Sequence, residues 1–434
     1  MKYSLFSLFL FLIQGISLCA QETDSAYLLQ PDRVFDGRNM HEHWDVWVKG
    51  HQIMDAGESG TLHPTGPFTT LVLKGATLLP GLIEGHSHLF LHPYNETKWD
   101  QQVLNESIAE RTARAVVHAR NTLMAGFTTV RDLGTEGAGY SDVGLKEAIG
   151  KGIIPGPRMI VATRAIVATG SYGPKRKNLE HQLVRGAAEA DGYDALIKEA
   201  RTQIGNGADL VKVYADYRWG LETDISEPTF TLEELKTVVA VASSSGREVV
   251  AHASTAEGMR RAALAGVATI EHGDNGTKEI FDLMKEHNVA YCPTLSAAEA
   301  TASYDGWKPG TLPEPVRVST KRKSFALALQ EGVTICMGGD VGVFTHGDNA
   351  REMEAMVRYG MKPLEVLRSA TSVNAKVFGY GDKIGSIRKG MLADLIAVSG
   401  NPADTISAIR NIRLVMKEGH IYSAPLTHSS KNHP

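Results

Sequence analysis

The sequence predicts an α/β fold: a (β/α)8 TIM barrel with a small β-sandwich domain built from both ends of the chain. Three observations predict it. Between about residues 78 and 378, eight short apolar runs alternate with longer helical stretches, which is typical of repeated strand–helix units. Before and after this region, short β-type runs are separated by turn residues. A length of 434 residues suits one large barrel with a smaller attachment, and 43% hydrophobic residues exclude a disordered chain.

The first twenty residues are expected to lie outside the fold. Residues 1–20 combine an early positive charge, an apolar run and a small residue before a polar segment, which is typical of a secretory signal peptide. The apolar run is too short to cross a bilayer, which takes about 20 residues. The sequence therefore predicts an exported protein, periplasmic or secreted, without a transmembrane segment. Lipoprotein anchoring at Cys19 is less favoured, because bulky Leu18 precedes the cysteine where a small residue is expected.

The rest of the chain divides by pattern into three parts. Residues 21–80 and 379–425 are expected to form a composite β-domain, residues 81–378 the barrel, and residues 426–434 a solvated tail. The expected barrel strands start with the run at Leu78 and continue at 126–130, 158–161, 208–213, 248–252, 268–272, 290–292 and 333–337. The expected helices include 106–125, 188–204, 232–245 and 277–287. Outside the barrel, strands are expected at 27–30, 45–49, 70–73, 393–398, 412–416 and 419–422.

Composition narrows the class of function. The net charge of −4 and a pI near 6.5 do not indicate a nucleic-acid binder. A mean hydropathy of −0.15 excludes a polytopic membrane protein. Three cysteines are too few for a disulfide scaffold, and Cys292 and Cys336 lie in strand-like apolar runs that predict free, buried thiols. The expected partner is a small molecule, and the oligomeric state stays open, a homo-oligomer included.

Six side chains that can bind a metal or transfer protons fall at the carboxyl ends of predicted barrel strands. His86 and His88 are two residues apart, so their imidazoles point to the same face of a strand. Because barrel enzymes place their active sites at this rim, we expect the six side chains to converge there. Imidazole and carboxylate ligands suit zinc or a similar divalent ion. The six residues are His86, His88, Lys212, His252, His272 and Asp340.

Each of these residues has a plainer interpretation on its own. The chain has 16 histidines, and a single histidine is more often a surface or hydrogen-bonded core residue. A buried strand lysine such as Lys212 can serve only an ion pair, and an aspartate after Gly-Gly, such as Asp340, is often a turn residue. The ordered series His-x-His, Lys, His, His, Asp on strands one, four, five, six and eight favours a metal centre.

The motifs around these residues resemble the amidohydrolase superfamily over essentially the whole chain after residue 20. The resemblance lies in 79–88 (LPGLIEGHSH), 211–214 (VKVY), 251–253 (AHA), 270–273 (IEHG), 338–340 (GGD) and the return segment 385–396 (GSIRKGMLADLI). Within the superfamily, the chain is most similar to binuclear members that cleave dipeptides and N-acyl amino acids. These include Xaa-Pro and Xaa-Arg/Lys dipeptidases and ochratoxin-hydrolysing amidases, and many relatives carry imidazolonepropionase-like names.

This resemblance implies two divalent metal ions, with zinc expected, bridged by a Lys212 that carbon dioxide has carboxylated. The His-x-His pair and Asp340 would hold the first ion, and His252 and His272 the second. A water between the ions would lose its proton near neutral pH, and Asp340 would take a proton during attack and return it to the leaving amine. Burial near cations lowers the pKa of a lysine amine, which capture of carbon dioxide requires.

The substrate side of the pocket departs from the family pattern. Relatives that cleave C-terminal residues often carry a histidine in a Gly-Gly-His-Gly stretch after strand three, where this chain has 169–173 (TGSYG). Tyr172 could therefore polarise the scissile carbonyl or merely line the loop. The other substrate-binding candidates are Tyr214, which shares the face of the strand-four lysine if that strand continues, Tyr217, Arg218 for a substrate carboxylate, and His346, which could equally brace its loop. Arg131 and Asp132 on strand two are expected to form an internal ion pair.

The favoured function is hydrolysis of an amide that joins an acyl or aminoacyl group to a C-terminal amino acid. The tyrosines and Trp219 near the rim suggest a bulky hydrophobic or aromatic leaving residue. Lactonase or phosphotriesterase activity is an alternative, because the same hydroxide attacks esters. A single-metal deaminase or cyclic-amide hydrolase is less favoured, because Lys212 is present and no glutamate follows His252 by three residues. A non-catalytic metal-binding protein is least favoured, because the ligand set is complete.

Overall fold

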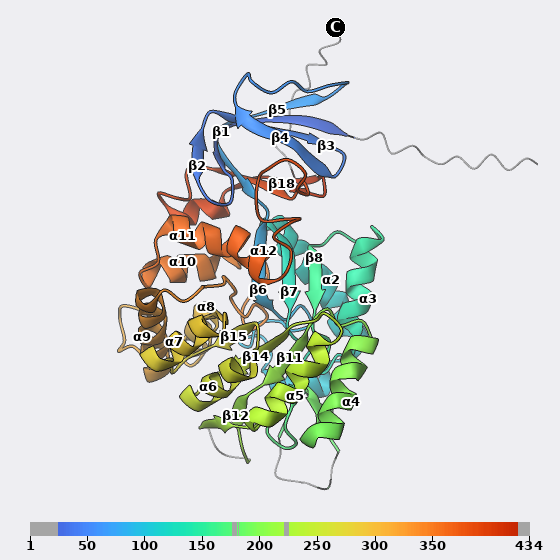
Figure 1. Cartoon of the computed structure of the whole chain (residues 1–434), viewed down its shortest axis with the longest axis vertical. Coiled ribbons are helices and arrows are strands. Elements are labelled where there is room, and N and C mark those ends of the chain that lie inside the picture. The colour runs from blue at the N-terminus through green and yellow to red at the C-terminus, as the bar shows by residue number, and fades with distance from the viewer. Residues whose placement is uncertain (1–24, 176–179, 181, 221–224, 424–434) are drawn as a thin grey trace, which may run out of the picture.

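The computed structural model describes residues 25–175, 180, 182–220 and 225–423 (Figure 1). The expected signal peptide, with Cys19, and the expected tail 426–434 lie outside the described residues. Over the described ranges, no helix is both long enough and apolar enough to cross a membrane. Cys292 and Cys336 are free and buried, as the sequence predicts.

Both ends of the chain contribute strands to one eight-stranded sheet, at the top of the molecule in Figure 1. Its order is β19-β18-β17-β5-β1-β3-β4, with β2 paired to β1. Only β1 and β5 pair in parallel within this sheet. These ladders form one continuous sheet and do not by themselves define the predicted sandwich. The strands are β1 Ala26–Phe35, β2 Met40–Glu42, β3 Trp44–Lys49, β4 Gln52–Glu58, β5 Thr69–Pro80, β17 Leu395–Ser399, β18 Ile412–Lys417 and β19 His420–Ser423.

The middle of the chain forms parallel strands surrounded by helices. The strand orders are β6-β7-β8 and β10-β9-β11-β14-β15-β16, and every pair in both sheets is parallel. The strands are β6 Leu82–Ser87, β7 Phe127–Asp132, β8 Arg158–Val161, β9 Ile166–Val167, β10 Ala188–Glu189, β11 Val211–Tyr214, β14 Val249–Ala253, β15 Thr269–His272 and β16 Ala290–Cys292. A separate antiparallel hairpin follows β11 and consists of β12 Asp216–Arg218 and β13 Ser226–Pro228.

Helices alternate with these strands and lie outside them in Figure 1. The predicted helices correspond to α2, α4, α5 and α7, with ends that differ by a few residues. The helices are α1 Trp99–Asn105, α2 Ile108–Met124, α3 Ser141–Gly150, α4 Gly192–Gly205, α5 Leu232–Ser243, α6 Ala256–Ala265, α7 Lys278–Glu286, α8 Leu295–Tyr304, α9 Val316–Glu331, α10 Ala350–Arg358, α11 Pro363–Arg368 and α12 Asn374–Val377. A π-helical turn, η1 Ser369–Val373, and a 3-10 turn, η2 Ile406–Arg410, complete the described elements.

The strand predicted at 333–337 is the main difference in the barrel region. Only an isolated parallel bridge between Tyr291 and Ile335 marks it. Cys336 N donates to Tyr291 O over 2.8 Å, and on the other side Gly85 N donates to Met337 O over 3.1 Å. The segment therefore lies between β16 and β6 but is too irregular to form a ladder.

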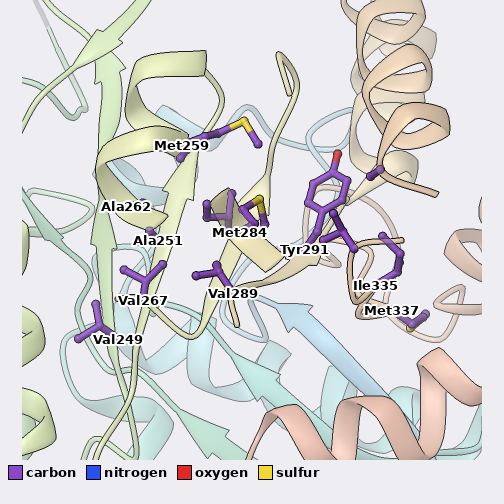
Figure 2. Packing of buried hydrophobic residues seen from close by; sticks show 14 of the residues in the cluster. Val249, Ala251, Met259, Ala262, Val267, Met284, Val289, Tyr291, Ile335 and Met337 are labelled. Atoms are coloured by element: carbon purple, nitrogen blue, oxygen red, sulfur yellow. The ribbon is translucent and has the colours of Figure 1, made fainter. Parts of the chain in front are cut away.

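Side-chain alternation along the strands separates the core from the site. On β14, Val249 and Ala251 belong to the large core cluster of Figure 2, together with Met259, Met284 and residues of the neighbouring strands. His252 lies on the opposite face of β14, because successive side chains of a strand point to opposite sides. The helix layer thus buries one side of each strand, and the other side is left for polar residues at the strand ends.

Candidate active site

The predicted metal ligands converge at the carboxyl ends of the parallel strands. On β11, Val211 and Val213 belong to the large core cluster of Figure 2. Lys212 therefore points to the opposite side of its strand, as His252 does. The ring centroids of His86 and His88 are 5.3 Å apart, and that of His86 lies 5.0 Å from that of His272. The rings of His252 and His272 are 4.4 Å apart.

Asp340 brings a carboxylate into this cluster. Its Oδ1 atom lies 3.6 Å from His86 Nε2 and 3.4 Å from His88 Nε2. Possible ligand atoms of His86, His272 and Asp340 all lie within 4.8 Å of one another. This spacing fits side chains gathered around a metal centre.

The electrostatics of the cluster keep the imidazoles neutral. Burial lowers the pKa of His86 and of His88 to about 4. Burial also holds the pKa values of His252 and His272 well below their ordinary value. At neutral pH each ring therefore keeps a nitrogen lone pair, which is the form that binds a metal.

Lys212 is the least ordinary member of the cluster. It is 1% exposed, and its Nζ atom has no hydrogen-bond partner among the described residues. Burial lowers the pKa of its amine. A buried amine without a partner is costly, so an additional group at Nζ would relieve that cost. Together with the neutral imidazoles and Asp340, this orphaned atom makes the donor set fit a divalent metal centre.

A buried ion pair orients His86. Its Nδ1 atom lies 2.8 Å from Glu271 Oε2, and Glu271 Oε1 accepts from Arg131 Nη2 over 2.7 Å. Burial alone would raise the pKa of Glu271, but Arg131 and His86 outweigh it and hold that pKa well below its usual range. The expected pair between Arg131 and Asp132 is wrong. The two are adjacent on β7 and point to opposite faces, and Asp132 accepts from Leu89 N instead.

The other candidate ligands have similar supports. His88 Nδ1 lies 2.9 Å from Gly134 O, and His272 Nδ1 lies 2.8 Å from Thr294 Oγ1. A hydrogen bond at Nδ1 leaves Nε2 available for a metal. Glu84 links two ligand segments, because its Oε1 accepts from the backbone N–H groups of His86 and Gly339. Glu84 and Glu271 were not recognised in the sequence.

The backbone at the site is unusual as well. His272 has a φ of 75° and Asp340 a φ of 62°, in the left-handed region that residues other than glycine rarely adopt. Such strain persists where the surrounding structure enforces it, often at functional sites. Gly338 permits this arrangement, since a Cβ atom there would lie 2.6 Å from Cys292 Sγ and 2.8 Å from His86 N.

A cavity of about 840 Å³ opens onto the cluster, and three tyrosines form one of its walls. The ring centroids of Tyr172 and Tyr214 are 4.8 Å apart, as are those of Tyr172 and Tyr217. Tyr214 also stacks on His252 at 4.5 Å. From the predicted set, the lining residues include His88, Tyr172, Tyr214, Tyr217, Arg218, His252, His272 and Asp340.

Glu136 is a lining residue that sequence reasoning missed. Its Oε2 atom accepts from Tyr172 Oη over 2.6 Å and from Trp99 Nε1 over 3.0 Å. Burial raises its pKa to about 7, and its φ is 51°. Its position shortly after β7 was the only signal in the sequence, because the loop 133–140 carries no motif that indicates a site.

The remaining predicted substrate contacts lie in different surroundings. Arg218 is exposed at the cavity mouth, where its Nη2 donates to Tyr217 Oη over 2.9 Å. Trp219 donates from Nε1 to Pro228 O over 3.4 Å. His346 is buried, with Nε2 3.0 Å from Leu91 O and its ring stacked on His118 at 4.3 Å. These contacts support the loop-bracing interpretation of His346.

Comparison with known proteins places this geometry in a family. The model described as "Amidohydrolase family" matches residues 77–422. The chain is 30% identical over 379 residues to a protein from Aspergillus niger named "Ochratoxinase", covering 80% of this chain and 76% of that protein.

Solved structures agree with this match. A structure described as a "Xaa-Pro dipeptidase with bound methionine in the active site" is 31% identical with a TM-score of 0.81, covering 92% of this chain and all of that one. The structure of A. niger ochratoxinase is 25% identical with a TM-score of 0.79, covering 93% of this chain and 97% of that one. These neighbours imply a TIM barrel with a small second domain.

Proposed function

Because the chain belongs to the amidohydrolase family, we propose that it is a binuclear metal-dependent hydrolase that cleaves the amide bond of dipeptides or N-acyl amino acids. The family and its relatives support amide or peptide hydrolysis in general. The site supports the finer proposal. The observation that carries it is the buried, unpartnered Lys212 Nζ among four neutral imidazoles and Asp340.

The metal part of the proposal assigns ligands to residues. His86, His88 and Asp340 would hold one divalent ion, His252 and His272 the other, and a carboxylated Lys212 would join the two. Zinc is the first expectation, since imidazole and carboxylate ligands suit it. When bound, such ions lower the pKa of a water and polarise a carbonyl oxygen.

The chain's own groups would bind the substrate and move its protons. Asp340, with its carboxylate directed at the His-x-His pair, would accept the proton of the attacking water and deliver it to the leaving amine. Tyr172 and Tyr214 would face the scissile group from the cavity wall. Arg218 at the mouth would meet the carboxylate of the leaving residue. The aromatic wall supports a bulky hydrophobic or aromatic leaving residue, as does similarity to an ochratoxinase and a dipeptidase.

The proposal includes a closed eight-stranded barrel over residues 81–378. Asp209 N donates to Val161 O over 2.8 Å, which links β8 to the approach of β11, and the 333–337 segment links β16 to β6. Residues 21–80 and 379–425 would form the composite β-domain. We also propose export through residues 1–20, which N-terminal mass analysis of the exported protein tests.

Metal stoichiometry measured alongside a substrate panel tests the function. Metal-reconstituted enzyme would be assayed on dipeptides and N-acyl amino acids with aromatic, basic and proline leaving residues, and on lactone and phosphotriester controls. We expect two metals per chain and amide cleavage with an aromatic preference. Two metals with only ester cleavage would favour the lactonase or phosphotriesterase alternative. One metal or none would overturn the Lys212 bridge, and a clear Arg/Lys preference would overturn the aromatic leaving residue.

A further inference from the structure

The tyrosine wall contains a carboxylate that the proposed reaction does not use. Glu136 is 2% exposed and lines the cavity, yet only one of its two oxygens is satisfied. Oε2 accepts from Tyr172 and Trp99, whereas Oε1 has no hydrogen-bond partner in the part of the chain that the structure describes. A buried carboxylate oxygen without a donor is costly, so a donor from a bound molecule would be favourable.

Two buried cationic side chains, Arg111 and Lys212, act electrostatically on this carboxylate, but neither donates a hydrogen bond to it. The guanidinium of Arg111 donates instead to three backbone carbonyls, those of Phe90, Thr135 and Glu136 itself, over 2.8 to 3.0 Å. Trp99 and Tyr172 contribute neutral donors only. The direct partners of the Glu136 carboxylate therefore carry no positive charge.

Aromatic rings surround the same place. Tyr172, Tyr214 and Tyr217 have ring centroids within 4.8 to 5.6 Å of one another, and Tyr94 also lines the cavity. Aromatic faces attract cations, and a carboxylate among them adds charge and hydrogen-bond acceptors. The packing is close. A Cβ atom on Gly186 would lie 2.6 Å from Trp99 and 2.8 Å from Tyr172, so the glycine at this position leaves room for the two rings.

We propose that Glu136 and the tyrosines Tyr172, Tyr214 and Tyr217 form a subsite for a protonated amine of the substrate. Its occupant is the α-ammonium group of a dipeptide, so the enzyme prefers substrates with a free amino terminus over their N-acylated counterparts. This inference rests on the proposed function and sharpens it, because it decides between dipeptides and N-acyl amino acids.

The test compares matched substrates in the metal-loaded enzyme. N-acetylation of Ala-Phe removes the positive charge of the amine and adds an acetyl group, so the Glu136 variant serves to separate the effect of charge from that of size. N-acetyl-Ala-Lys places an ammonium on the leaving residue instead. We expect wild type to cleave Ala-Phe with at least tenfold higher kcat/KM than its acetylated form. Glu136→Gln keeps an acceptor for Tyr172 and removes the negative charge, so the assays are run above pH 7, where Glu136, with its pKa raised to about 7, is ionised. The variant should lower kcat/KM for Ala-Phe about tenfold or more, mainly through KM, and change that for N-acetyl-Ala-Phe less than about twofold.

Controls separate this proposal from its rivals. Asp305→Asn removes an exposed carboxylate at the mouth of the same cavity and should leave the ratio between the two substrates unchanged. Equal losses on both substrates in Glu136→Gln would mean that Glu136 only positions Tyr172, which overturns the subsite. A Glu136-dependent preference for N-acetyl-Ala-Lys would keep an ammonium subsite but move it to the leaving residue. No amide cleavage by wild type would refute the proposed function itself, independently of Glu136.

Discussion

The strand-end cluster and the tyrosine wall face the same cavity but are built differently. In the cluster, His86, His88 and His272 each have an Nδ1 atom fixed by a partner, and regular strands or short turns beside them supply the backbone. In the wall, Tyr214 and Tyr217 lie on β11 and β12, but Glu136 and Tyr172 come from loops after β7 and β9, and Tyr172 and Trp99 donate to the Glu136 carboxylate. The difference fits the proposed function, in which the cluster would supply the chemistry and the wall would select the substrate.

The largest expected effect comes from breaking the cluster itself. Lys212→Ala and Asp340→Asn should each lower kcat at least about 1000-fold, because they remove the proposed bridging group and the proposed proton acceptor. Circular dichroism should show an intact fold. Lys417→Ala is a matched control, since Lys417 on β18 of the terminal sheet is also buried, but its Nζ donates to Gly156 O. Activity within tenfold of wild type in either cluster variant would contradict the assigned roles.

The next effect concerns the support of the cluster. Glu271→Gln keeps an acceptor for His86 but leaves Arg131 buried without a charged partner. We expect metal affinity to fall about 10- to 100-fold and unfolding free energy by roughly 3–5 kcal/mol. Metal content after dialysis against graded chelator and the Tm are the measurements. Glu257→Gln is the control, because its pairs with Arg260 and Arg261 lie at the surface and should cost about 1 kcal/mol or less. Unchanged metal retention would show that His86 does not need Glu271.

The sequence predicted the cluster and missed its supports for one physical reason. A strand has a period of two and ends at the active rim, so His86, Lys212 and His252 could be placed from local pattern alone. Glu271 meets His86 across 185 residues of chain, and no local pattern encodes that distance. The mistaken pairing of Arg131 with Asp132 has the same origin, since adjacency in sequence puts the two side chains on opposite faces.

For the fold as for the cluster, the sequence predicted local elements and missed contacts between distant parts of the chain. Seven of the eight expected strand runs appear as strands in the structure, at β5–β6, β7, β8, β11, β14, β15 and β16. The run 333–337 was apolar enough to predict a strand, but only an isolated bridge to Tyr291 forms there, and Gly338 lets the chain that follows lie close against His86 of β6. The continuous terminal sheet depends on pairing β5 with β17 across most of the chain, and alternation indicates strands without naming their partners.

A smaller effect is expected from the wall. Tyr172→Phe removes the hydroxyl that donates to Glu136 and should lower kcat/KM roughly tenfold, while metal content stays that of wild type. Tyr359→Phe is a matched control. Tyr359 Oη donates to Glu299 Oε1 over 2.5 Å, and neither residue lines the cavity. A loss of metal in Tyr172→Phe would show that wall and cluster are not separate regions, and the comparison would fail.

The smallest effect on activity is expected at a carboxylate outside both regions. Glu352 is fully buried, and its two oxygens accept from Leu295 N and Ser296 N at the start of α8, over 2.9 and 2.7 Å. Burial raises its pKa to about 7. The Glu352 carboxyl group therefore binds a proton more tightly in the folded state than in the unfolded chain. The stabilisation that follows is complete below about pH 4.5 and is lost as pH rises through about 7.

Glu352→Gln removes this titration, so the stability of wild type relative to the variant should fall by roughly 1–3 kcal/mol between pH 5 and pH 8. Unfolding midpoints of both proteins at the two pH values measure it, and the subtraction cancels every titration that they share. Turnover by the variant should stay near that of wild type, since Glu352 caps a helix and does not line the cavity described above. A pH-independent difference would contradict the raised pKa. A raised carboxyl pKa occurs both here and at Glu136, so it is position in the cavity, with an oxygen left for a ligand, that distinguishes a binding group from a structural one.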